Sequence, residues 1–519
     1  MNTTTVLTLL LIIIFFAIMI TIGIRTRRHA RSVTGFVLGS RSVGPWLSAF
    51  AFGTSYFSAV IFVGYAGQFG WNFGVASTWI GLGNAFIGSL LAWLILGRRT
   101  RIMTQHLDSR TMPDFFGSRF GSQKLRVTAS VITFIFLIPY TASLYNGLSR
   151  LFAIAFPGLD YAVCVVVMAI LTCCYVVLGG YMATATNDFI QGCIMLFGIS
   201  AVIIAVLRDN GGLNMAMESL ATGENGGWQY ASFLGADPGF LFFVIMLTSL
   251  GTWGLPQMVG KFYAITNEDA IKKGTVISTF FAIIVAGGCY FLGGFGRLYD
   301  IDVETEGFDA IIPNMLSTLS PIIIGIIIVL VLSASMSTLS SLVLTSSSTI
   351  TLDFIGPLKK KPIKENTKVV IMRSFIVVFV IISAIIAIKQ AHARSLFIAQ
   401  MMGISWGALA GSFLAPFLYG LYTKFVSKAA VACCFIWACL LEITQLFVSL
   451  EMINVSGSAL LSFVFRNSLY SGVFAMVGGL VIVPIVTALT RGGIPKNAEE
   501  IFGCYHEHRT VEVMDNLGD

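Results

Sequence analysis

The sequence has few charged residues for its length, since only 11% of its 519 residues are Asp, Glu, Lys or Arg. Soluble proteins usually carry about 25% of these residues. The shortage excludes an ordinary soluble chain, and the hydrophobic residues, 56% of the total, stand in long runs from end to end. The sequence therefore predicts a helical protein that crosses the lipid bilayer many times.

Motifs for metal binding and for hydrolytic chemistry are also missing. The five histidines fall in predicted loops or in the tail, and the nine cysteines have no metal-type spacing. There is no phosphate-binding loop, no nucleophile elbow and no HExxH motif. The net charge of +7 is spread over many loops, which argues against a nucleic-acid partner. We expect neither an enzyme nor a nucleic-acid-binding protein, and no obligate protein partner is evident.

Thirteen apolar segments are long enough to cross a membrane. They cover residues 5–24, 46–67, 75–97, 127–156, 160–179, 187–208, 239–259, 274–297, 321–350, 369–388, 397–421, 428–450 and 469–490. Most of the 32 Lys and Arg residues fall in one alternating set of the intervening loops. By the positive-inside rule this set faces the cytoplasm, which predicts a plasma-membrane protein with its N-terminus outside and its C-terminus in the cytoplasm.

Two of these segments carry signals for a broken helix. Gly53 stands beside two hydroxyl residues in the second segment, while Gly251, Gly254 and Pro256 lie close together in the seventh. Backbone freed by a break is tolerated at membrane depth only where it lines a cavity. A kinked packing helix is the alternative for the second segment.

The spacing of the two breaks predicts the organisation of the chain, because two inverted repeats of five helices would place them five segments apart. We expect an N-terminal helix with an inner loop, a first repeat, an outer loop, a second repeat, two added helices and a cytoplasmic tail. The corresponding ranges are 1–45, 46–208, 209–238, 239–421, 422–490 and 491–519.

The segment at 321–350 carries small and hydroxyl residues on one helical face. Ala334, Ser337, Thr338 and Ser341 fall at i, i+3, i+4 and i+7, and Ser340 lies beside them. Such a face serves either close helix packing, with each hydroxyl bonded to its own backbone, or ligation of a small cation. The spacing alone leaves both interpretations open.

Asp188 is one of very few acidic residues near the apolar segments. A carboxylate at membrane depth is costly unless it is paired, hydrated or bound to a cation. The alternative is a helix cap, made by Asn187 or Asp188 at the start of the segment 187–208.

Five stretches together carry a family resemblance. They are GSRSVGP (39–45), GTSYFSAVIFVGYAG (53–67), TMPDFF (111–116) followed by Arg119 and Phe120, the block 179–191 around Asp188, and SASMSTLSSLVLTSSS (333–348). In this order they resemble the sodium:solute symporter family, in particular its sodium/proline branch. The resemblance implies an all-α fold of the LeuT type with a 5+5 inverted repeat, and sodium-coupled uptake of a small organic solute by alternating access.

The resemblance also implies where sodium binds. The ligands of a first sodium would be three backbone carbonyls and two hydroxyls, contributed by Thr54, Phe57, Ala334, Ser337 and Thr338. All are oxygens, as a hard cation requires. Some family members hold a second sodium, and Asp188, Ser340 and Ser341 match that pattern here. Asp188 lining only the inner exit route is the other interpretation.

The solute is expected beside the two breaks. The residues assigned to it are Ser55, Tyr56, Ser58, Tyr140, Thr252, Trp253 and Gln257. Two aromatic positions tied to proline in the family are Thr248 and Thr252 here, so proline is not favoured. An amino acid or carboxylate is favoured, with its carboxylate at the positive end of a half-helix. A sodium-coupled sugar or vitamin symporter, proton coupling, and a transporter-fold sensor without net transport are the alternatives.

Overall fold

The structure is a computed structural model, and it describes residues 3–156, 158–359, 361–393 and 398–507. These residues form helices joined by short loops, with one isolated parallel β-bridge between Val43 and Ile265. The predicted all-helical fold is confirmed. The end of the predicted tail, residues 508–519, lies outside the described residues.

The α-helices of the first half are α1 (Thr3–Thr26), α2 (Val33–Leu38), α3 (Pro45–Tyr56), α4 (Ala66–Phe73), α5 (Thr78–Gly83), α6 (Arg98–His106), α7 (Met112–Phe120), α8 (Gln123–Ala155), α9 (Tyr161–Asp209), α10 (Leu213–Thr222), α11 (Pro238–Leu250) and α12 (Pro256–Tyr263). Those of the second half are α13 (Glu268–Ala282), α14 (Gly288–Gly293), α15 (Val303–Glu306), α16 (Ile311–Ser317), α17 (Pro321–Thr349), α18 (Gly356–Leu358), α19 (Glu365–Ala393), α20 (Ile398–Tyr422), α21 (Lys428–Ser449), α22 (Ala459–Val464), α23 (Ser468–Leu489) and α24 (Ala498–Glu507).

Short 3₁₀ and π segments extend or join these helices. The π segments are η3 (Val60–Tyr65), η5 (Asn84–Leu91), η6 (Trp93–Gly97), η8 (Ile283–Gly287) and η11 (Ile350–Ile355). The 3₁₀ segments are η1 (Arg27–Arg31), η2 (Gly39–Arg41), η4 (Gly74–Ser77), η7 (Gly251–Gly254), η9 (Gly296–Leu298), η10 (Phe308–Ala310) and η12 (Arg491–Gly493).

The described residues contain ten helices that are long and apolar enough to cross a membrane, or up to eleven if the bent pair at residues 238–263 is one span. The predicted count of thirteen spans is therefore not confirmed. Helical structure continues through two places where separate spans were expected, at η4 and at Gly180. The helix α9 holds both predicted segments 160–179 and 187–208, with Gly180 (φ +56°, ψ −148°) as a non-helical kink between its two parts.

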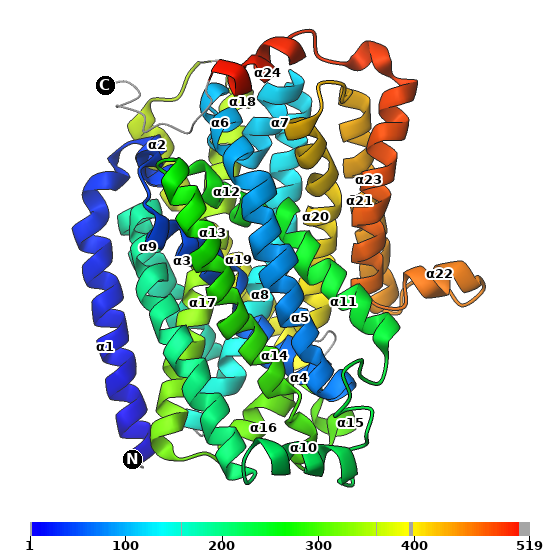
Figure 1. Cartoon of the computed structure of the whole chain (residues 1–519). Helices are drawn as coiled ribbons and strands as arrows, with labels where there is room; N and C mark the ends of the chain where they lie inside the picture. Colours follow the sequence, from blue (N-terminus) through cyan, green and yellow to red (C-terminus); the bar gives the residue numbers. More distant parts are fainter. Residues whose placement is uncertain (1–2, 157, 360, 394–397, 508–519) are drawn as a thin grey trace.

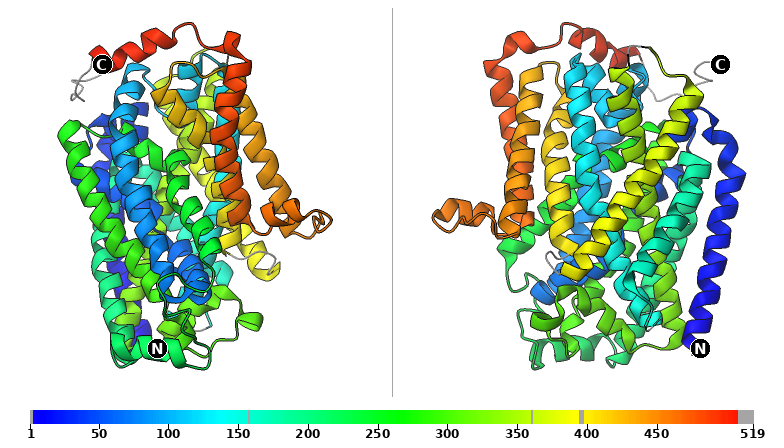
Figure 2. Two further views of the ribbon diagram at one scale, coloured as in Figure 1. Left: turned by 45° about the vertical axis from the view of Figure 1, so that its right-hand side comes forward. Right: turned by 180° about the vertical axis from the view of Figure 1, so that it is seen from behind.

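The bundle has a buried centre and two exposed edges (Figures 1 and 2). Of the 18 most apolar consecutive residues in α20, 94% are buried. In the span that contains α1, only 28% of the corresponding residues are buried. Figure 1 shows α1 at one edge and α21 with α23 at the other. The hydroxyl-rich helix α17 lies inside and packs against α1, α3, α8, α9 and α19.

One end of the bundle is held together by a buried arginine. Arg41 donates to the carbonyls of Ser109 (2.8 Å), Thr104 (3.1 Å) and Tyr263 (3.3 Å). Burial lowers the pKa of Arg41 to about 10, so its guanidinium remains charged at neutral pH. Tyr263 is the last residue of α12, so Arg41 fixes the end of that helix.

Candidate functional site

The first broken span interrupts its helix near the middle of the bundle. The helix α3 begins at Pro45 and ends at Tyr56, and Phe57 follows with an extended backbone (φ −87°, ψ 125°). Helical structure resumes after Ser58 and continues into η3. Because the last turn of a helix leaves carbonyl oxygens without intrahelical donors, the break supplies free acceptors inside the protein.

Two hydroxyls of α17 lie against these carbonyls. The Oγ of Ser337 is 3.1 Å from the carbonyl oxygen of Thr54 and 3.0 Å from that of Ala334. The Oγ1 of Thr338 is 3.1 to 3.3 Å from the carbonyl oxygens of Ala334, Thr54 and Phe57. The structure thus brings together all five residues expected to bind the first sodium.

The chemistry of this cluster suits a small cation. The carbonyl oxygen of Ala334 already accepts a backbone hydrogen bond within the continuous helix α17, whereas the carbonyls of Thr54 and Phe57 at the break receive side-chain hydrogens only from the hydroxyls of Ser337 and Thr338. All five residues are buried, with exposed fractions of 1% or less, so bulk water does not supply the missing donors. A surplus of oxygen lone pairs in a closed space is the environment that a hard monovalent cation requires.

The residues expected at a second sodium lie differently. The hydroxyl of Ser340 donates to the carbonyl of Ser337 (2.9 Å). The carboxylate of Asp188 is fully buried and forms an ion pair with Lys261 (3.5 Å from Nζ to Oδ2). Lys261 also donates to the hydroxyl of Ser341 (2.9 Å). The lysine therefore stands between Asp188 and Ser341.

Lys261 is a candidate site residue that the sequence interpretation missed. It follows the predicted segment 239–259 by two positions, so the sequence places it in the loop after that segment. In the structure it lies on α12 and is only 3% exposed. Gln257 stands one turn earlier, so the two side chains share a helical face. A polar pair at i and i+4 beside a break was the signal available in the sequence.

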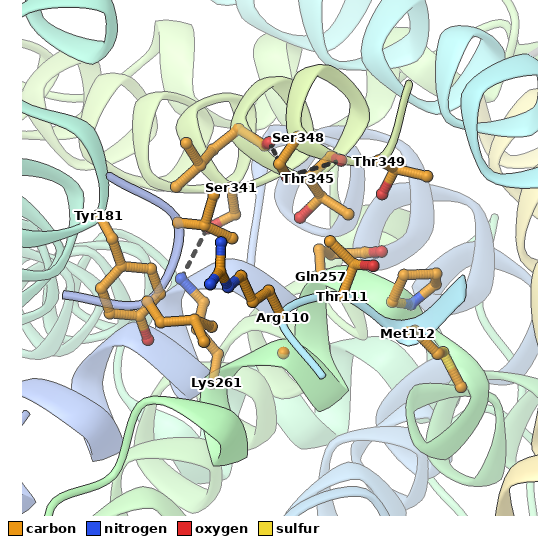
Figure 3. A pocket seen from close by; sticks show the side chains of 15 residues that line it. Arg110, Thr111, Met112, Tyr181, Gln257, Lys261, Ser341, Thr345, Ser348 and Thr349 are labelled. Carbon is orange, nitrogen blue, oxygen red and sulfur yellow. Dashed lines mark hydrogen bonds between the residues drawn. The ribbon is translucent and has the colours of Figure 1, made fainter. Parts of the chain in front are cut away.

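The second broken span places this pair at a cavity. Leu255 has an extended backbone (φ −83°, ψ 120°) between η7 and α12, and the two parts of the span meet at 46°. Gln257 and Lys261 line a cavity whose other walls include Arg110, Tyr181 and Ser341 (Figure 3). Neither amide atom of Gln257 has a hydrogen-bond partner in the described part of the chain.

The seven residues assigned to the solute are not gathered in one place. Tyr56 and Tyr140 flank Trp406, with ring centroids 5.9 and 6.0 Å from its ring. The hydroxyl of Thr252 is 2.8 Å from the carbonyl oxygen of Ser249 and 3.2 Å from that of Gly88 in η5. The indole of Trp253 donates to the carbonyl of Ile87, also in η5, at 3.0 Å.

The other three assigned residues take separate positions. Ser58 is buried at the first break. The hydroxyl of Ser55 is 2.7 Å from that of Ser341, and Gln257 lies at the cavity beside Lys261. The two breaks therefore contribute to two distinct environments, one aromatic and one polar.

Comparison with known proteins gives consistent matches. The model of the sodium:solute symporter family matches residues 36–436. Sodium/proline symporters from Staphylococcus aureus strains JH9 and NCTC 8325 are each 28% identical over 435 residues, covering 81% of this chain and 82% of the relative.

Solved structures show the same fold. A Na⁺-coupled sialic acid symporter, solved in a substrate-bound outward-open state, matches with a TM-score of 0.73 at 16% identity, covering 93% of this chain and 98% of that one. A manganese transporter from Eremococcus coleocola matches with a TM-score of 0.51 at 12% identity, covering 86% and 95%. At these identities the likeness concerns the fold alone.

Proposed function

Because the chain belongs to the sodium:solute symporter family, we propose that it uses the sodium gradient to take up an amino acid or a small carboxylate by alternating access. Sodium-coupled solute uptake across the plasma membrane, rather than an enzymatic reaction, is the activity of this family. The proposal that the solute is an amino acid or a carboxylate goes further than family membership alone. It is supported by the sodium/proline symporters among the relatives.

The oxygen cluster at the first break is the observation that carries the proposal. The carbonyls of Thr54, Phe57 and Ala334 and the hydroxyls of Ser337 and Thr338 would hold the coupling sodium. The ligands come from both halves of the site, namely the broken span and α17. Sodium therefore ties the two elements together, and solute and sodium should raise each other's affinity by the same factor.

The solute is proposed to bind beside this cluster, against the aromatic rings. Tyr56, Tyr140 and Trp406 provide apolar faces for a small side chain. The helix that starts after Ser58 presents the positive end of its dipole, which favours a carboxylate. Gln257 at the cavity offers both amide atoms to a solute that leaves toward Arg110.

The proposed orientation puts Arg110 and the cavity mouth on the cytoplasmic side. Figure 1 shows α6, α7 and α24 at one end of the bundle and α10, α15 and α16 at the other. Many basic residues belong to the first end, which supports the N-terminus outside and the C-terminus inside. The inverted repeats at 46–208 and 239–421 remain part of the same proposal, supported by a break in the first helix of each.

Transport assays in proteoliposomes test the function. Labelled amino acids, carboxylates, vitamins and sugars are offered under an imposed sodium gradient, with choline replacing sodium as the control. We expect one amino acid or carboxylate to accumulate only with sodium. Equal uptake in choline contradicts sodium coupling, and accumulation of a sugar or vitamin alone contradicts the solute class. Binding without flux would instead indicate a sensor.

A further inference from the structure

Near Ser341, the hydroxyl face of α17 meets a cation that belongs to the protein itself, the ammonium of Lys261. The ammonium of Lys261 is 2.9 Å from the hydroxyl of Ser341 and 3.5 Å from the carboxylate of Asp188 (Figure 3 shows the lysine and Ser341). It also lies 5.3 Å from the ring centre of Tyr181, within the range of a cation–π contact. The Asp188 and Lys261 side chains are 0% and 4% exposed, so the pair is buried.

The hydrogen bonds around Ser341 have a defined direction. An ammonium has donors and no acceptor, so Lys261 donates to Ser341. Ser55 donates its hydrogen to the carbonyl of Ala51 (2.6 Å), so its bond with Ser341 (2.7 Å) must be donated by Ser341. The chain of donors runs from the ammonium through two hydroxyls to the backbone of α3. One lone pair of the Ser341 hydroxyl therefore already accepts a hydrogen bond from a positively charged group.

We infer that the ammonium of Lys261 takes the place of a second sodium, so that this transporter couples one sodium to each solute. The inference rests on the proposed function and concerns the same site. Asp188 and Ser341 are two of the three residues expected at a second sodium, and Lys261 contacts both. The third, Ser340, donates to the carbonyl of Ser337.

Charge balance supports this assignment. Asp188 supplies one negative charge and Lys261 one positive charge, so the buried pair is neutral. A sodium ion bound between Asp188 and Ser341 would bring a second positive charge next to the ammonium of Lys261. No second carboxylate would balance that charge. At about 4 Å, repulsion between two cations in a protein environment lowers affinity on the order of a thousandfold. The first sodium site is separate, because its ligands Ser337 and Thr338 lie about one helical turn away on α17.

The decisive experiment compares sodium-to-solute flux ratios in proteoliposomes, with labelled sodium and the solute found by the uptake assay. We expect a ratio of one for the unmodified protein. Lys261→Ala leaves the Asp188 carboxylate available, so its ratio should rise to two and uptake should depend more steeply on sodium. Lys272→Ala, which removes an exposed lysine from the next helix, is the control and should keep the ratio of one.

A double variant separates the possible failures. Asp188→Asn with Lys261→Met removes both charges and should keep the ratio of one. A ratio of two in the unmodified protein, or a ratio of one in active Lys261→Ala, overturns the inference. If Lys261→Ala fails to fold even in sodium, a ratio of one in both the unmodified protein and the double variant supports the inference, and two in either overturns it. Uptake without any sodium dependence would instead refute the proposed function.

Discussion

The two broken spans have nearly the same backbone at their breaks but surround them with opposite chemistry. Phe57 and Leu255 are both extended, with φ/ψ of −87°/125° and −83°/120°. At the first break, carbonyl oxygens meet the hydroxyls of Ser337 and Thr338. After the second break, α12 brings the ammonium of Lys261 to Asp188 and Ser341.

The difference shows that a broken helix does not by itself make an ion site. The first break leaves acceptors without a permanent positive charge, which suits an ion that binds and leaves. The second supplies a permanent positive charge from the chain itself. The two lie along one helix, α17, so a single hydroxyl face meets free carbonyls at one turn and a fixed ammonium at the next.

The largest effect is expected from breaking the ion pair between Asp188 and Lys261. Asp188→Ala leaves the ammonium of Lys261 buried without its carboxylate, and removing one member of a buried pair costs about 3–5 kcal/mol. Thermal unfolding in detergent should show a clear fall in Tm. Adding Lys261→Met should restore most of it, since no unpaired charge remains. A single variant as stable as the unmodified protein would show that the pair is not a structural unit.

A smaller effect is expected from crowding the second break. A Cβ at Gly254 would lie 2.8 Å from the Cα of Ala410 and from the backbone nitrogen of Leu414. The backbone of α20 cannot yield easily, so Gly254→Ala should cost about 1–3 kcal/mol. The matched control is Gly260→Ala on α12, where the added Cβ meets nothing within 4 Å. Equal stability of the two variants, measured by denaturant unfolding, would contradict the close packing at the break.

The next test addresses the proposed sodium site at the first break. Thr338→Val keeps the side-chain shape and removes one oxygen, so half-saturating sodium should rise about tenfold, or ~1.4 kcal/mol. The solute KM at saturating sodium should change much less. Thr338→Ser retains the hydroxyl and serves as the control. Unchanged sodium activation in Thr338→Val would remove this residue from the site.

The smallest effect probes the link between the two regions. Ser55→Ala removes the acceptor of the bond donated by Ser341, and Ser341 can then bond back to its own helix. A loss of about 0.5–1.5 kcal/mol in stability is expected, with the sodium-to-solute ratio unchanged. A changed ratio would show that Ser55 takes part in setting the number of cations.

Much of this architecture could be predicted from local patterns. Glycine and proline near residues 53 and 251–256 marked both breaks, because these residues disfavour continuous helix wherever they stand. The period of Ala334, Ser337 and Thr338 placed three proposed sodium ligands on one face. The number of spans was harder to predict, because helical structure continues past Gly180 and through η4, where the hydropathy profile suggested separate segments.

The sequence by itself determined that this is a many-span helical membrane protein, where its helices break and which helix carries the hydroxyl face. These follow from composition and from periods of a few residues. Only the tertiary structure decided what stands opposite that face, because Thr54 and Lys261 are 284 and 80 positions from their partners Thr338 and Ser341. No local pattern encodes such distances. Whether a hydroxyl faces a free carbonyl or a fixed ammonium depends on how the breaks pack against α17.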